Sequence, residues 1–234
     1  MRALSIFCDE ADQQDMSAGY YLITIVSHDQ NAPVDVHVED YQRRLAAHQL
    51  PDIPFHIKEL MHGHGDYEGV DQFTRKGLLV HFNAFVRRLP IQYQTFFYSS
   101  YDTTDTTLSA RMGRDIVNFA VDRLGWLQSF DAVPVYYDQG QQAVTTALYR
   151  AFDLVLGSKV VDYRRISYRD YRLAQAADYL CSVELAGMRY QSGNVSRTYR
   201  KFYGQSQSFK RNYLKPARRK FIARAATVAP LGPS

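Results

Sequence analysis

Three aspartates in this chain follow or interrupt apolar segments. Asp9 and Asp138 each come at the end of a strand-like run, and Asp178 lies in a helical pattern rich in alanine. Glu59 stands in the short segment 55–60 and is the natural fourth acidic residue. Converging carboxylates repel one another unless a cation lies between them, and oxygen ligands suit Mg²⁺ or Mn²⁺. We therefore predict a divalent-metal site with these four residues as ligands.

A carboxylate-held metal favours hydrolysis of phosphodiester bonds, because the ion activates water and stabilises the leaving oxygen. His56 and Lys58 flank Glu59 and are candidates to assist at the phosphate. Glu10 follows Asp9 directly and points to the opposite sheet face if the strand continues. The predicted catalytic set thus contains the four metal ligands together with His56 and Lys58.

Other interpretations of these residues stay open. An Asp at a strand end commonly starts a turn, and His56 after Pro54 can be structural. A zinc site built from His56, His62 and His64 is an alternative. The sequence contains no nucleophile elbow, no phosphate-binding glycine-lysine loop and no dinucleotide fingerprint, so these chemistries find no support.

Hydrophobic periodicity predicts the elements that position these side chains. Strands precede a region of alternating helices and strands, which predicts an α/β protein with a mixed sheet covered by helices. The segment 55–60 is expected to be short and extended or turn-like. Strands are expected over 3–9, 19–26, 91–98, 133–137 and 160–166, and helices over 36–48, 71–89, 108–127, 142–156 and 172–190.

Charge is distributed unevenly along the 234 residues. Eleven of the 28 Lys and Arg residues follow Glu184, whereas none of the 24 Asp and Glu residues does. Aromatic residues are interleaved with these cations, which is typical of nucleic-acid binding but also of a helix that packs on an acidic body. We predict a basic helical extension over 191–234. Its candidate substrate-binding residues are Arg197, Arg200, Lys201, Lys210 and Arg211.

The remaining features bear on the compartment. Cys8 and Cys181 lie in apolar segments and are expected to be buried free thiols. The sequence has no run of 18 apolar residues, so no membrane partner is expected. Met1–Leu4 leads directly into a strand without a secretory pattern. These observations favour a cytoplasmic location and leave the oligomeric state open.

Four short motifs give the chain a resemblance to a known family. Asp9-Glu10, the segment Phe55–Leu60, Tyr137-Asp138 and Gln175–Asp178 occur in an order that resembles the domain-of-unknown-function family numbered thirty-eight hundred, in the ribonuclease H-like superfamily. The family's Ser-Gly after Asp-Glu is absent here. The resemblance covers roughly residues 3–190 and implies a ribonuclease H-like domain over 1–190. It also implies a two-metal carboxylate site formed by Asp9, Glu59, Asp138 and Asp178.

The sequence therefore predicts a metal-dependent nuclease that uses Mg²⁺ or Mn²⁺, with nucleic acid held by the basic extension. The alternative is a non-catalytic nucleic-acid-binding or adaptor module on the same fold, in which the carboxylates are structural. A fold alone does not decide between these functions. The sequence does not indicate whether the substrate is DNA or RNA, or whether cleavage is internal or from an end.

Overall fold

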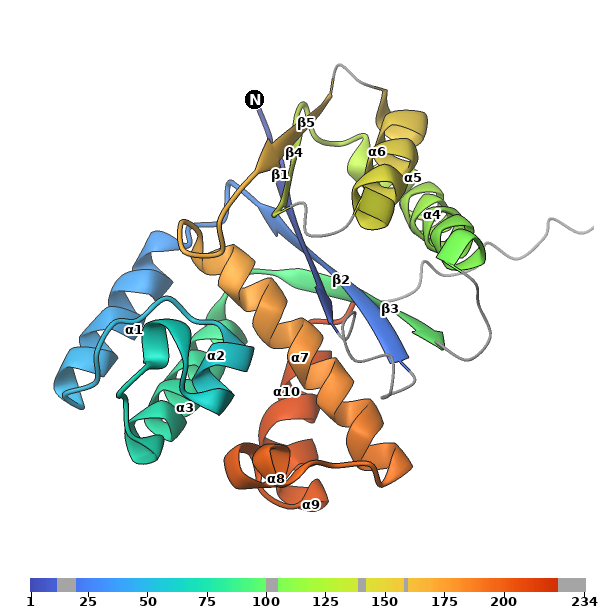
Figure 1. Cartoon of the computed structure of the whole chain (residues 1–234). Coiled ribbons are helices and arrows are strands. Elements are labelled where there is room, and N and C mark those ends of the chain that lie inside the picture. Colours follow the sequence, from blue (N-terminus) through green and yellow to red (C-terminus); the bar gives the residue numbers. More distant parts are fainter. Residues whose placement is uncertain (12–19, 100–104, 139–141, 158–159, 223–234) are drawn as a thin grey trace, which may run out of the picture.

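The computed structural model describes residues 1–11, 20–99, 105–138, 142–157 and 160–222, which form an α/β structure around a five-stranded mixed sheet (Figure 1). The sheet has the order β3-β2-β1-β4-β5. β1 pairs antiparallel with β2 and parallel with β4, so the carboxyl ends of β1 and β4 lie at the same edge. The strands are β1 (Leu4–Ala11), β2 (Tyr20–Asp29), β3 (Gln92–Ser99), β4 (Val133–Tyr137) and β5 (Val161–Arg165).

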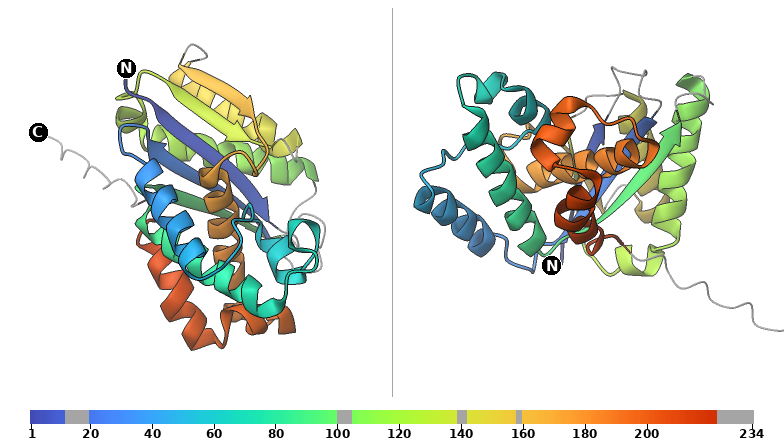
Figure 2. Two further views of the ribbon diagram at one scale, coloured as in Figure 1. Left: turned by 90° about the vertical axis from the view of Figure 1, so that its left-hand side faces the viewer. Right: turned by 90° about the horizontal axis from the view of Figure 1, so that it is seen from below.

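Both faces of the sheet are covered, because alternate side chains of each strand enter different cores. Phe7 and Val26 belong to one core, and Ile6 and Ile25 belong to the other. The first core is covered by α1 (Asp35–Ala47), α2 (Ile57–His62), α3 (Gln72–Arg88) and α7 (Arg172–Ser192). The second is covered by α4 (Asp105–Val121), α5 (Leu124–Leu127) and α6 (Gln142–Leu156). Figures 1 and 2 show these two helical layers on opposite sides of the strands.

The predicted α/β class is confirmed, and most predicted elements appear within a few residues of their expected bounds. Two differ in kind. The segment 55–60 contains the start of helix α2, because Ile57, Leu60 and Met61 are all buried and have helical spacing. The single helix expected over 108–127 is interrupted where Arg123 leaves the helical conformation, with φ −122° and ψ 19°. Packing against the rest of the protein decides that segment 55–60 begins a helix. Three apolar residues are too few for the sequence pattern to predict it.

The basic segment after α7 packs into the same core as the sheet. It contains α8 (Arg197–Tyr203), α9 (Ser206–Phe209), the π-helical segment η4 (Lys210–Leu214) and α10 (Lys215–Arg218). Its buried aromatic residues include Phe202, Phe209 and Tyr213. Farther on, the backbone of Ile222 donates to Tyr93 of β3 at 2.8 Å. These aromatic rings are therefore core residues. The domain boundary predicted between residues 190 and 191 stays a prediction. Arg224 lies outside the described residues.

Candidate functional site

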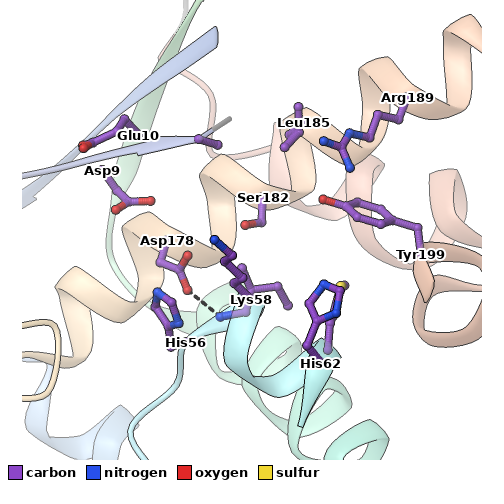
Figure 3. A pocket seen from close by; sticks show the side chains of 13 residues that line it. Asp9, Glu10, His56, Lys58, His62, Asp178, Ser182, Leu185, Arg189 and Tyr199 are labelled. Atoms are coloured by element: carbon purple, nitrogen blue, oxygen red, sulfur yellow. Dashed lines mark hydrogen bonds between the residues drawn. The ribbon is translucent and has the colours of Figure 1, made fainter. Parts of the chain in front are cut away.

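A cavity of about 430 Å³ opens beside the carboxyl end of β1 (Figure 3). One wall is a stripe of α7 with spacings of four, three and four residues, which places Asp178, Ser182, Leu185 and Arg189 on one helix face. The opposite wall comes from α2 and the residue before it. The tail contributes Tyr199 of α8. Elements distant in sequence thus line one polar cavity.

Asp9 and Asp178 meet at the carboxylate end of this cavity. Asp9 is half-buried and shares the face of Phe7, so it points toward α7, and Figure 3 shows its carboxylate directed at Asp178. Burial raises the pKa of Asp9 well above its ordinary value, and the negative charge of Asp178 raises it further. Two of the four predicted ligands, Asp9 and Asp178, therefore lie together in this cavity.

Asp178 is buried, with 8% of its surface exposed. Its Oδ2 accepts a hydrogen bond from the backbone N–H of Ile57 at 2.8 Å. Burial raises its pKa, while the nearby His56 and this N–H group act in the opposite direction. Helix α2 thus holds one oxygen of Asp178. Gln175, one turn earlier, donates instead to the carbonyl of Tyr168 at 3.0 Å.

Asp138 lies next to Asp9 along the sheet edge but outside the cavity lining. β1 and β4 pair in a register that sets Phe7 opposite Tyr136. Asp9 lies two residues after Phe7 within β1, and Asp138 lies two residues after Tyr136, directly past the end of β4. Asp138 is exposed, yet its charge raises the pKa of Asp9. It is therefore a neighbour of the pair at the rim.

Glu10 lies on the face of the sheet opposite to Asp9, as strand alternation predicts. Its Oε2 is buried without a hydrogen-bond partner among the described residues, and Figure 3 shows the side chain pointing away from Asp178. Burial raises the pKa of Glu10 to about 7, with a further contribution from Asp138. Glu10 adds negative charge to this edge of the sheet without facing Asp178.

Glu59, a predicted metal ligand, does not line the cavity. Its Oε2 accepts from the backbone N–H of Asp66 at 3.2 Å, and the Tyr168 hydroxyl donates to Oε1 at 3.4 Å. The Nδ1 atom of His56 lies 3.8 Å from Oε1. Gly65, with φ 59°, leaves the space that Glu59 occupies, since a Cβ there would lie 2.4 Å from Oε2. The structure therefore places Glu59 behind His56.

Arg189, from the last turns of α7, lies at the other end of the cavity (Figure 3). Lys58 and His62 line the cavity from α2. The Arg189 guanidinium lies over the Tyr199 ring, 5.0 Å from its centroid. Sequence analysis identified Lys58 but missed Arg189 and Tyr199 as cavity residues. The spacing of Asp178, Ser182, Leu185 and Arg189 was the available signal for the helix face, whereas the position of Tyr199 depends on tertiary folding.

The predicted tail cations lie elsewhere. All five are exposed, and the cavity lining does not include them. The tail instead reaches the cavity through Tyr199, whose backbone N–H donates to the cap residue Ser196 at 3.2 Å. The five residues are Arg197, Arg200, Lys201, Lys210 and Arg211.

The structure brings two of the four predicted ligands together, Asp9 and Asp178, rather than all four. Within the described ranges, no group of three or more His, Cys, Asp or Glu side chains is arranged to hold a metal ion. That finding covers Asp9, Glu59, Asp138 and Asp178, and also the alternative zinc set of His56, His62 and His64. Two facing acidic groups in a buried position nevertheless have the donor chemistry that Mg²⁺ or Mn²⁺ prefers, with water completing the coordination.

Comparison of the chain with family models, curated proteins and solved structures gives no match. Cys8 and Cys181 are both buried free thiols, as predicted. In the part of the chain that the structure describes, no helix has the length and apolar character needed to cross a membrane.

Proposed function

We propose that this chain is a divalent-metal-dependent nuclease with a ribonuclease H-like fold. The observation that supports it best is the facing pair of Asp9 and Asp178 in the cavity beside the sheet edge. Burial raises the pKa of both aspartates, and the charge of Asp178 raises that of Asp9 further, so the pair is costly to keep charged without a cation. The fold proposal is compatible with the sheet order β3-β2-β1-β4-β5 and with the family resemblance.

In this proposal Asp9 and Asp178 hold the ion, and Asp138 is the adjacent carboxylate that can reach it from β4. Bound Mg²⁺ or Mn²⁺ lowers the pKa of a coordinated water and stabilises the leaving oxygen. The backbone N–H of Ile57 fixes one oxygen of Asp178. The groups that position the ion therefore come from β1 (Asp9), the residue after β4 (Asp138), α2 (the Ile57 N–H) and α7 (Asp178).

His56 and Lys58 act on the phosphate in this proposal, as the sequence predicts. His56 lines the cavity and stacks near Tyr168, with ring centroids 4.8 Å apart. Glu59 lies on its far side, with its Oε1 atom 3.8 Å from His56 Nδ1, and in this proposal it holds the imidazole by charge. Glu59 is thereby a positioning residue, which differs from the ligand role predicted from sequence. Lys58 supplies a positive charge from the α2 wall.

The proposed substrate is nucleic acid, and the exposed cations of α8 and η4 hold its backbone. Arg197, Arg200 and Lys201 lie on or beside the helix that also contributes Tyr199. Phosphate contacts of this kind strengthen binding without sequence preference and weaken as salt rises. Lys210 and Arg211 extend the same basic segment.

The first test is a thermal melt with increasing Mg²⁺ or Mn²⁺ on the wild type, Asp178→Asn and Asp138→Asn. An ion that binds only the folded chain stabilises it by about 2.7 kcal/mol at ~100 times its dissociation constant. We expect the melting temperature of the wild type to rise by several degrees. The rise should disappear in Asp178→Asn and shrink in Asp138→Asn.

Glu68→Gln is the matched control, because Glu68 is exposed and lies outside the cavity. It should keep the full metal response. Hydrolysis of single-stranded and double-stranded DNA and RNA is then assayed with Asp9→Asn as the inactive variant. Full activity of Asp9→Asn, or no metal response in the wild type at millimolar metal, would contradict the nuclease proposal.

The alternative proposal is a non-catalytic nucleic-acid-binding or adaptor module. It is favoured by the finding that the described carboxylates form no group of three around an ion. It predicts nucleic-acid binding that is independent of Mg²⁺ and no strand cleavage. A filter-binding assay in EDTA, followed by metal addition, distinguishes the two proposals.

A further inference from the structure

The cavity has two ends of opposite charge. Asp9 and Asp178 form the acidic end, and Arg189 lies at the other end beside Tyr199 (Figure 3). Lys58 and His62 line the cavity from α2. Burial lowers the pKa of His62, with smaller contributions from His64 and Lys58, so the positive charge at the end away from the aspartates is that of Arg189. A ligand that fills the cavity therefore contacts the Asp9–Asp178 pair at one end and Arg189 at the other.

The two ends are too far apart to bind one phosphate. Asp178 and Arg189 are eleven residues apart on one face of α7, which corresponds to about 16 Å along the helix axis. An anion held at Arg189 is therefore a different group from one held by an ion at Asp178. A polymer with repeated phosphates can place one phosphate at Arg189 and another at the Asp9–Asp178 end.

The Arg189 end of the cavity is formed where α7, α8 and α2 meet. Tyr199 supports the Arg189 guanidinium, and Ser196 caps the α8 turn that carries this ring. The other side of α8 is attached to α2, because Arg75 lies over Phe202 and donates to the carbonyl of Leu60 at 2.6 Å. Packing thus fixes the relative positions of the Tyr199 ring and the α2 wall.

The volume of the cavity limits the ligand. About 430 Å³ is within the range of pockets for small molecules. A paired duplex is stiff and exposes its bases only at groove edges, whereas an unpaired strand can place a single nucleotide in such a cavity. Tyr199 adds an aromatic ring of the kind that accompanies single-strand binding.

We infer that the Arg189–Tyr199 end of the cavity is an anion subsite for a phosphate of an unpaired nucleic-acid strand. Arg189 pairs with that phosphate through its guanidinium fork, and Lys58 adds positive charge from α2. Another phosphate, farther along the same strand, lies at the Asp9–Asp178 end. The identity of the ligand as nucleic acid rests on the proposed function, but binding at Arg189 does not require the metal.

The test is calorimetric titration with AMP in EDTA, with adenosine as the uncharged comparison. We expect AMP to bind and adenosine to bind at least tenfold more weakly. Arg189→Gln should weaken AMP binding about tenfold or more, because a charge-assisted hydrogen bond is lost. Arg189→Lys, which keeps the charge without the fork, should retain part of the affinity.

Arg150→Gln is the matched control, since Arg150 is an exposed arginine on α6, across the sheet from the cavity. It should bind AMP as the wild type does. Tyr199→Leu removes the aromatic ring under the Arg189 guanidinium and serves as a second variant if Arg189→Gln does not fold. It should weaken AMP binding by a few-fold, and an unchanged affinity in both Tyr199→Leu and Arg189→Lys would contradict the subsite.

Competition with longer ligands tests the strand preference. A single-stranded oligonucleotide should displace AMP at lower concentration than its blunt duplex, and only when Arg189 is present. Equal competition by the duplex, or equal binding of AMP and adenosine, would overturn the inference. The metal titration on the same preparations separates the nuclease proposal from the subsite proposal. If the protein shows no metal response but binds AMP through Arg189, the nuclease proposal is rejected and the subsite is retained.

Discussion

Two buried carboxylates lie six residues apart on helix α7 and have opposite surroundings. Glu184 is fully buried and accepts from the Arg218 guanidinium at 2.7 Å and from the Tyr93 hydroxyl at 2.7 Å. Asp178 is also buried, but its described partners are a backbone N–H group and the facing acid Asp9. The charge of Glu184 is balanced by the Arg218 guanidinium, whereas Asp178 faces another carboxylate, that of Asp9.

This difference separates a structural carboxylate from a candidate functional one. Glu184 connects α7 to α10 and β3, so its partners come from elements that must dock for the chain to fold. Asp178 faces a cavity and shares it with another acid. A buried charge left without a protein cation favours protonation or an external cation. Burial alone does not distinguish the two residues.

The largest expected effect is destabilisation by Arg218→Ala. Glu184 would keep only the Tyr93 hydroxyl, so a charge fully enclosed by the protein would lose its cation. Because the Arg218 side chain is 52% exposed, we discount the usual cost of breaking a buried pair and expect a loss of about 2 kcal/mol. Urea denaturation measures it, with the exposed neighbour variant Arg219→Ala as control. Equal midpoints for the two variants would show that Glu184 does not need its partner.

A smaller effect of opposite sign is expected for Asp178→Asn. The amide keeps an oxygen acceptor for the Ile57 N–H and removes the charge that faces Asp9. In EDTA near pH 8 the free energy of unfolding should rise by about 1 kcal/mol, since the variant no longer buries a negative charge beside Asp9. Urea denaturation beside Asp9→Asn tests the pair. Destabilisation of both variants in EDTA would place Asp178 in the same structural class as Glu184.

A pH dependence of stability is also expected in the absence of metal. Burial raises the pKa of Glu10 from 4.5 to about 7, so the folded chain binds more protons than the unfolded chain between these values. Stability should therefore fall as pH rises from about 4.5 to about 7. The raised pKa values of Asp9 and Asp178 act in the same direction.

This dependence is measured by urea midpoints across that pH range in EDTA. Glu10→Gln should make the fall with pH shallower, because the variant cannot titrate at this position. Magnesium should reduce the fall in the wild type if the ion offsets the charge of the pair. A steeper fall in Glu10→Gln, or the same fall in both proteins, would contradict the assignment of this titration to Glu10.

Local patterns determined most of the secondary structure but only part of the site. Alternation along β1 predicted that Asp9 and Glu10 point to opposite faces, and the structure agrees. The alanine-rich pattern around Asp178 indicated a buried acid, which burial confirms. Glu59 could not be placed in this way, because its direction depends on a left-handed Gly65 and on contact with Tyr168.

The sequence by itself determined the α/β class, the acidic strand ends and the basic composition of the last segment, since these follow from residue type and periodicity. Only the tertiary structure decided which carboxylates meet, because strand order and helix docking are long-range. It paired Asp9 with Asp178, gave Glu184 its own cation, and packed the tail aromatics into the core. It also brought Tyr199 to Arg189, a contact between helices that no local pattern specifies.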